Sequence, residues 1–222
     1  MPLNLQPPII YLITSGETKR ATTPDSEEFA RILALVTRAV AARVQLVQLR
    51  EKNLPARTLY ELTTRAAEIT RGSSTRLLVN DRADIARAAR ADGVHLTTRS
   101  LEASVVRRTF GDQFLIGVST HTLAEARAAR DARADLAVFG PVFDTPSKRE
   151  YGAPVGLEHL SEAARTLSPF PLLALGGITR ENSPDALRAG ASGVAAIRLF
   201  SDGRNLDATV RAIRGGFGTR MV

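Results

Sequence analysis

Eight short apolar runs alternate with amphipathic segments along nearly the whole chain. The runs are continuously apolar, which is typical of strands that are buried on both faces in a parallel sheet. The segments between them repeat apolar residues at helical spacing. We expect strands at residues 9–14, 44–49, 77–80, 93–96, 115–119, 136–140, 172–176 and 193–197. We expect helices at residues 27–42, 56–70, 84–91, 101–110, 123–130, 157–167, 184–189 and 206–214.

Eight such units in 222 residues predict a single α/β domain over residues 1–222, built as a (β/α)8 TIM barrel. The barrel should span about residues 9–214, between short flexible termini. An open, doubly wound sheet is the alternative, because periodicity does not show whether a sheet closes.

Charge and composition exclude several classes of protein. The net charge of +7 is spread over helical segments such as residues 85–92, so we expect no nucleic-acid partner. The chain has no cysteine and therefore no disulfide or thiolate chemistry. Neither a membrane-spanning apolar stretch nor a secretory signal is visible, which predicts a cytoplasmic enzyme without a membrane partner.

Only three lysines occur among the 30 basic residues, so arginine supplies nearly all of the positive charge. Lys52 and Lys148 each stand shortly after an apolar run. Two compact ammonium groups at two strand ends predict a site for a polyanion such as pyrophosphate. Alternatively, both are ordinary solvated surface lysines.

Polar residues also gather where the second and third strands end, which is where barrels carry their chemistry. Gln48, Arg50 and Lys52 alternate in sequence and should face the same side, suited to an anion; alternatively, Arg50 pairs with Glu51. Asn80 and Asp81 suit a phosphate and Mg²⁺, although Asp81 alone is as well explained as a helix cap.

The later strand ends offer three more features. Gly176 and Gly177 follow the seventh strand and suit a phosphate, or simply a tight turn. Ser119 and His121 follow the fifth strand, and His121 is either a general acid or base or a residue that stabilises the loop or caps the next helix. His95 is expected inside the barrel or at its rim.

Taken in order, these motifs resemble the thiamine phosphate synthase/TenI superfamily over about residues 9–214. The resemblance is carried by Val-Gln-Leu-Arg-Glu-Lys at 47–52, Asn-Asp-Arg at 80–82, Asp-Gly-Val-His-Leu at 92–96, Gly-Val-Ser at 117–119, Gly-Pro-Val-Phe-Asp-Thr-Pro-Ser-Lys at 140–148, and Gly-Gly-Ile at 176–178 with Asn182.

The resemblance implies an enzyme that joins an aminopyrimidine diphosphate to a thiazole phosphate, giving thiamine phosphate and pyrophosphate. It implies that Asp81 binds Mg²⁺. It also implies that the pyrophosphate is held by Gln48, Arg50, Lys52, Asn80, Thr145 and Lys148. The thiazole phosphate would lie at Gly176, Gly177 and the backbone of Val194 and Ala195. Catalysis would rest on Lys148, Arg50, Ser119 and His121.

Two positions depart from the synthase pattern. Ser100 stands where a second metal-binding Asp is expected, next to Arg99, and Arg198 stands where Ser is frequent. Both departures lean toward a TenI-type thiazole tautomerase, which uses a histidine at the position of His121. A non-catalytic binder of thiamine precursors is the third alternative. The retained pyrophosphate residues favour the synthase. The oligomeric state is left open, a homo-oligomer included.

Overall fold

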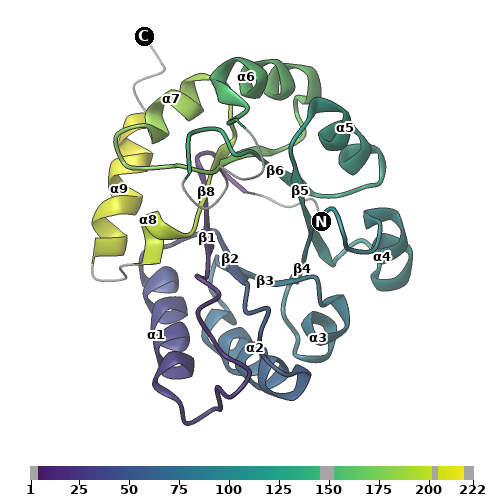
Figure 1. The fold of residues 1–222 in the computed structure, drawn as a ribbon, viewed down its shortest axis with the longest axis vertical. Helices are drawn as coiled ribbons and strands as arrows, with labels where there is room; N and C mark the ends of the chain where they lie inside the picture. Colours follow the sequence, from purple (N-terminus) through teal and green to yellow (C-terminus); the bar gives the residue numbers. More distant parts are fainter. Residues whose placement is uncertain (1–4, 146–152, 202–204, 218–222) are drawn as a thin grey trace.

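The computed structural model describes residues 5–145, 153–201 and 205–217. Its eight strands form one closed parallel barrel in sequence order, with the helices on the outside (Figure 1). The strands are β1 Ile9–Ile13, β2 Leu46–Leu49, β3 Arg76–Asn80, β4 Gly93–Leu96, β5 Leu115–Thr120, β6 Leu136–Phe139, β7 Leu172–Leu175 and β8 Gly193–Ala196. Closure is made by β8 pairing with β1, where Tyr11 lies opposite Ala195. The predicted barrel is confirmed, and the open sheet is excluded.

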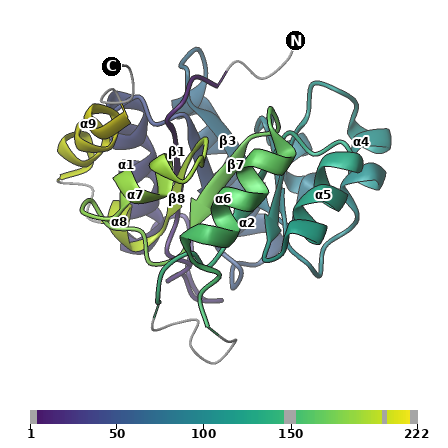
Figure 2. The ribbon, with the colours of Figure 1, turned by 90° about the horizontal axis from the view of Figure 1, so that it is seen from above.

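The helices that link these strands cover the outer face of the barrel. They are α1 Glu27–Ala41, α2 Ala56–Thr70, α3 Ala83–Ala88, α4 Ala103–Phe110, α5 Leu123–Asp131, α6 Gly156–Leu167, α7 Ser183–Arg188, α8 Arg198–Ser201 and α9 Leu206–Phe217. Figure 2 shows α6 and α7 lying outside β7 and β8. The short helix α8, directly after β8, was not predicted from the sequence.

Two boundaries differ from the prediction. The second strand begins at Leu46, two residues later than expected, and the side chain of Gln45 before it binds the segment that precedes β1, with its amide donating to the Pro8 carbonyl oxygen at 3.1 Å. Helix α4 begins at Ala103 and leaves Leu101 66% exposed, because the chain from 97 to 100 forms a turn of its own.

Two apolar cores result from the alternation of side chains along the strands. One lies between the sheet and the helices, and the other fills the barrel. The inner core consists of Ile9, Tyr11, Ile13, Leu46, Leu78, Leu136, Val138, Leu173 and Ala195. Because these side chains occupy the interior, we expect a ligand at the C-terminal ends of the strands, where TIM barrels carry their active sites. Among the described residues, no helix has the length and apolar character that a membrane crossing requires.

Candidate active site

A chain of amide and carboxylate groups joins the ends of β2 and β3. Gln48 is 1% exposed, and its Nε2 donates to Asn80 Oδ1 at 3.0 Å. Asn80 Nδ2 in turn donates to Asp81 Oδ2 at 2.7 Å. The other amide oxygen, Gln48 Oε1, is buried without a hydrogen-bond partner. A buried acceptor in this condition is costly, so it marks a place where a ligand can donate.

Asp81 is joined to this chain of side chains and is not a helix cap. The residue preceding α3 is Arg82, and Asp81 itself has a left-handed backbone with φ 58°. Its Oδ1 accepts hydrogen bonds from Ser100 Oγ and, at 3.2 Å, from Thr97 Oγ1. The capping alternative is therefore wrong. Position 100, where the family pattern has Asp, faces Asp81 directly.

The described residues contain no cluster of three or more metal-binding side chains. Asp81 is exposed and has hydroxyl neighbours in Thr97 and Ser100. Mg²⁺ is commonly held by one or two carboxylates together with substrate phosphates. The donor set therefore fits a single-carboxylate Mg²⁺ site that depends on a phosphorylated substrate for its remaining oxygens.

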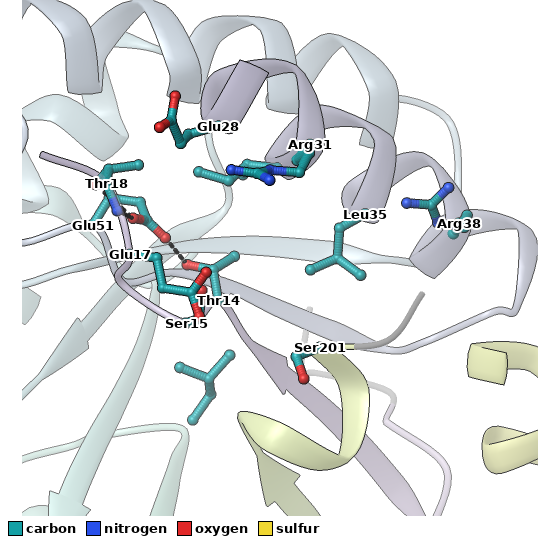
Figure 3. A pocket seen from close by; sticks show the side chains of 12 residues that line it. Thr14, Ser15, Glu17, Thr18, Glu28, Arg31, Leu35, Arg38, Glu51 and Ser201 are labelled. Atoms are coloured by element: carbon teal, nitrogen blue, oxygen red, sulfur yellow. Dashed lines mark hydrogen bonds between the residues drawn. The ribbon is translucent and has the colours of Figure 1, made fainter. Parts of the chain in front are cut away.

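Arg50 and Lys52 follow β2, and the side chain of Glu51 between them is bound to the segment after β1. Glu51 is 3% exposed and accepts from Thr14 Oγ1 at 2.5 Å and from Thr18 Oγ1 at 2.7 Å (Figure 3). The expected alternative, an Arg50–Glu51 pair, is therefore wrong. A Cβ on Gly16 would lie 3.1 Å from Arg50 Nη1, so the guanidinium packs against the β1–α1 loop. Lys52 is exposed.

A cavity of about 170 Å³ lies beside this loop, between α1 and α8 (Figure 3). Its lining carries both charges, since it includes Glu17, Glu28, Arg31 and Arg38. Of the predicted substrate-binding residues, none lines it. The cavity is thus separate from the Gln48–Asn80 chain.

The segment after β6 contributes Thr145, which is 9% exposed and has an unpartnered, buried Oγ1. Lys148, the other predicted residue of this segment, lies outside the described residues. Within the described part of the chain, Gln48 Oε1 and Thr145 Oγ1 are the two buried side-chain atoms without a partner. Both belong to residues that the sequence predicts to bind substrate.

The Gly176–Gly177 turn packs tightly against the segment after β6. The two residues have φ values of 96° and 64°, a region that favours glycine. A Cβ on Gly176 would lie 2.6 Å from Pro141 Cα, and one on Gly177 would lie 2.6 Å from the Asp144 carbonyl oxygen. Close packing of two loops is therefore one reason for both glycines. Their contact with a phosphate remains a prediction.

The end of β8 offers mainly backbone to a ligand. Val194 packs in the outer core and Ala195 in the inner core. Their side chains are fully buried, so only main-chain groups near the strand end are available for the predicted phosphate contact. Arg198 is exposed and begins α8.

His95 lies inside the barrel, as predicted. It is 2% exposed, and its Nδ1 and Nε2 lie 3.0 Å from Tyr11 Oη and 2.9 Å from Ser119 Oγ. Burial lowers the pKa of His95 to about 4, against a smaller opposing effect of the Asp81 carboxylate. Burial also raises the pKa of Tyr11 well above its ordinary value. Sequence analysis missed Tyr11, which reads as one more apolar position of β1.

His121 is exposed at the end of β5, and its Nδ1 contacts the Gly140 carbonyl oxygen. A carbonyl oxygen only accepts, so Nδ1 carries the hydrogen and Nε2 is left as the basic nitrogen. The cap of α5 is Thr122, whose Oγ1 accepts from the Glu125 amide at 3.1 Å. His121 therefore does not cap this helix.

A closed parallel barrel with amides, a carboxylate, an arginine and a glycine turn at its strand ends has the architecture of a TIM-barrel enzyme. The family model described as thiamine monophosphate synthase matches residues 11–200, and the chain belongs to this family.

Relatives and solved structures agree with this membership. A thiamine-phosphate synthase of Moorella thermoacetica is 41% identical over 182 residues, covering 82% of this chain and 86% of that protein. A thiamine-phosphate synthase of a Roseiflexus species is 38% identical over 207 residues, covering 92% and 83%. The solved thiamine phosphate pyrophosphorylase of Pyrococcus furiosus superimposes with a TM-score of 0.79 at 27% identity, covering 96% of both chains.

Proposed function

We propose that this chain is a thiamine-phosphate synthase. It joins 4-amino-2-methyl-5-hydroxymethylpyrimidine diphosphate to thiazole phosphate and releases pyrophosphate. Family membership and the synthases at 38–41% identity support the reaction. The observation that supports this reaction at the candidate site is the pair of unpartnered buried atoms, Gln48 Oε1 and Thr145 Oγ1. An aminopyrimidine has an exocyclic N–H that can donate to the first, and a phosphorylated group can take the hydroxyl hydrogen of the second.

The chain's own contribution to the reaction is electrostatic. Arg50, Lys52 and Lys148 bind the diphosphate as the bond between the methylene carbon and the leaving oxygen breaks and its electron pair passes to pyrophosphate. Cations that are held in place before the charge develops stabilise the transition state more than the bound substrate. The thiazole nitrogen then donates its lone pair to the methylene carbon, forming the new C–N bond.

Asp81 would hold Mg²⁺, with the remaining ligands taken from the diphosphate. When bound, the ion adds positive charge next to the leaving group. Asn80 and Ser100 orient the Asp81 carboxylate through their hydrogen bonds. Because Ser100 provides a hydroxyl in place of a second carboxylate, we expect weak metal binding in the absence of substrate.

The thiazole phosphate is assigned to the turn at Gly176 and Gly177 and to the backbone at the end of β8. Backbone N–H groups at such a turn suit a phosphate. Arg198, at the start of α8, adds a cation near the end of β8. The partners are therefore small phosphorylated substrates, and we place the enzyme in the cytoplasm.

A thiazole tautomerase is the second candidate, and His121 is the observation that favours it. The contact of its Nδ1 with the Gly140 carbonyl leaves Nε2 as a base with a fixed orientation. Such a histidine suits proton transfer on a thiazole ring. A tautomerase has no pyrophosphate to bind, however, and this would leave Arg50, Lys52 and Lys148 without a purpose.

A paired assay tests the proposal. Purified protein with Mg²⁺ is given the aminopyrimidine diphosphate and the thiazole phosphate, and thiamine phosphate and pyrophosphate are measured. In parallel, it is given one tautomer of the thiazole carboxylate phosphate, and conversion to the other is followed. The proposal expects equimolar thiamine phosphate and pyrophosphate. Tautomer conversion without thiamine phosphate would replace it by the second candidate, and binding without either product would leave a non-catalytic binder.

A further inference from the structure

Three polar side chains from three strands form a chain of hydrogen bonds inside the barrel. The Tyr11 hydroxyl of β1 lies 3.0 Å from His95 Nδ1 of β4, and His95 Nε2 lies 2.9 Å from Ser119 Oγ of β5. Tyr11 is 0% exposed and His95 is 2% exposed, whereas Ser119 is half-buried near the end of its strand. The chain therefore leads from the closed core toward the mouth of the barrel.

The fold holds the imidazole of His95 in a fixed place. A Cβ on Gly117 would lie 2.7 Å from His95 Nδ1, so the absence of a side chain there makes room for the ring. The rings of Tyr11 and His95 meet edge to face, with centroids 5.6 Å apart. Both ring nitrogens are consequently aimed at one partner each.

The direction of the hydrogen bonds follows from the fully buried hydroxyl group of Tyr11. The Tyr11 hydroxyl carries one hydrogen, and His95 Nδ1 is its acceptor among the described residues. A buried hydroxyl left without an acceptor is costly. Nδ1 must therefore offer its lone pair, which places the imidazole hydrogen on Nε2, and Nε2 donates to Ser119 Oγ.

Hydrogen bonds in the opposite direction would leave the Tyr11 hydroxyl without an acceptor. If Ser119 donated to Nε2, the hydrogen on Nδ1 would point at the tyrosine oxygen, and the tyrosine hydrogen would have no acceptor in the core. The pKa values support the neutral forms that this reasoning uses, since burial lowers the pKa of His95 to about 4 and raises that of Tyr11.

We propose that Tyr11 and His95 are positioning residues that fix Ser119 as a hydrogen-bond donor toward the bound substrate. With its oxygen accepting from His95, the Ser119 hydroxyl has its own hydrogen left for an acceptor atom at the barrel mouth, such as a diphosphate oxygen or a pyrimidine ring nitrogen. The role toward substrate rests on the proposed function, whereas the direction of the hydrogen bonds does not.

Nitrogen-15 NMR of histidine-labelled protein tests the direction without any assay of activity. The signals of His95 are assigned by their loss in His95→Gln. At neutral pH, roughly four-fifths or more of His95 should carry its hydrogen on Nε2, the share set by the cost of an unmade buried hydrogen bond. In Tyr11→Phe, the form with the hydrogen on Nδ1 should appear. Ser119→Ala is the matched control and should leave Nε2 protonated, because Tyr11 still decides the tautomer.

A wild-type His95 with its hydrogen on Nδ1 would overturn the proposal, as would an unchanged tautomer in Tyr11→Phe or a switched one in Ser119→Ala. Because the wild-type spectrum is decisive by itself, a variant that fails to fold does not remove the test.

Kinetics test the positioning role. Tyr11→Phe should lower kcat by roughly 5- to 10-fold, the equivalent of one ordinary hydrogen bond. In a Ser119→Ala background, the same substitution should have no further effect, because Tyr11 acts through Ser119. Multiplying effects in the double variant would refute the positioning role. If the wild type makes no thiamine phosphate, the proposed function fails while the NMR result still decides the direction of the hydrogen bonds.

Discussion

Acidification should destabilise this protein through His95, the buried imidazole inside the barrel. Its pKa is about 4 in the folded state and 6.5 for an unperturbed side chain. Between these values the unfolded chain binds more protons than the folded one, so stability rises with pH in this range. The contribution of His95 is fully present above the unfolded pKa and is lost as the pH falls toward about 4.

The two pKa values give the size of the effect. From about pH 7 to about pH 5, the unfolded state gains about three-quarters of a proton at this site, while folded His95 stays almost neutral. The difference in the free energy of unfolding is about 2 kcal/mol. Gln at position 95 has an acceptor and a donor for the same two neighbours but does not titrate, which makes His95→Gln the matched control.

Urea unfolding followed by circular dichroism measures the effect at both pH values. The wild type should lose about 2 kcal/mol more than His95→Gln on acidification, whatever the two stabilities are at neutral pH. Equal losses in both proteins would show that the buried imidazole does not resist protonation, and the reasoning would then be refuted.

Three further predictions concern the site. Lys148→Ala should lower synthase kcat on the order of 10²-fold, whereas His121→Ala should have a secondary effect. Lys19→Ala is the control for the loss of a lysine. If the enzyme is a tautomerase, His121→Ala should instead lower its activity roughly 10²–10⁴-fold, and Lys148→Ala should change it little. Ser100→Asp should tighten Mn²⁺ binding, measured by calorimetry, and lower the Mg²⁺ concentration for half-maximal activity; unchanged values would contradict the metal assignment. Gly177 has a φ of 64°, and a Cβ there would lie 2.6 Å from a neighbouring carbonyl oxygen. Gly177→Ala should therefore lower the free energy of unfolding, measured with urea, on the order of 1–3 kcal/mol, and a variant as stable as the wild type would contradict the packing argument.

The sequence by itself determined the architecture, and it supplied the candidate residues of the site as predictions. Eight apolar runs with helical spacers can bury their surfaces only in a parallel sheet covered by helices, and the predicted barrel, its family and the interior position of His95 are confirmed. The motifs also predicted a substrate-binding role for Gln48 and Thr145, each of which has a buried side-chain atom without a hydrogen-bond partner. Alternation along β2 correctly separated Gln48 from its apolar neighbours.

Only the tertiary structure decided which polar groups meet. Glu51 accepts hydrogen bonds from Thr14 and Thr18 instead of pairing with Arg50, and Ser100 reaches Asp81 across a loop. Tyr11 contacts His95 across 84 positions of sequence. No local pattern encodes such contacts, because strand spacing fixes the face on which a side chain lies, whereas barrel closure and register fix its partner across the interior.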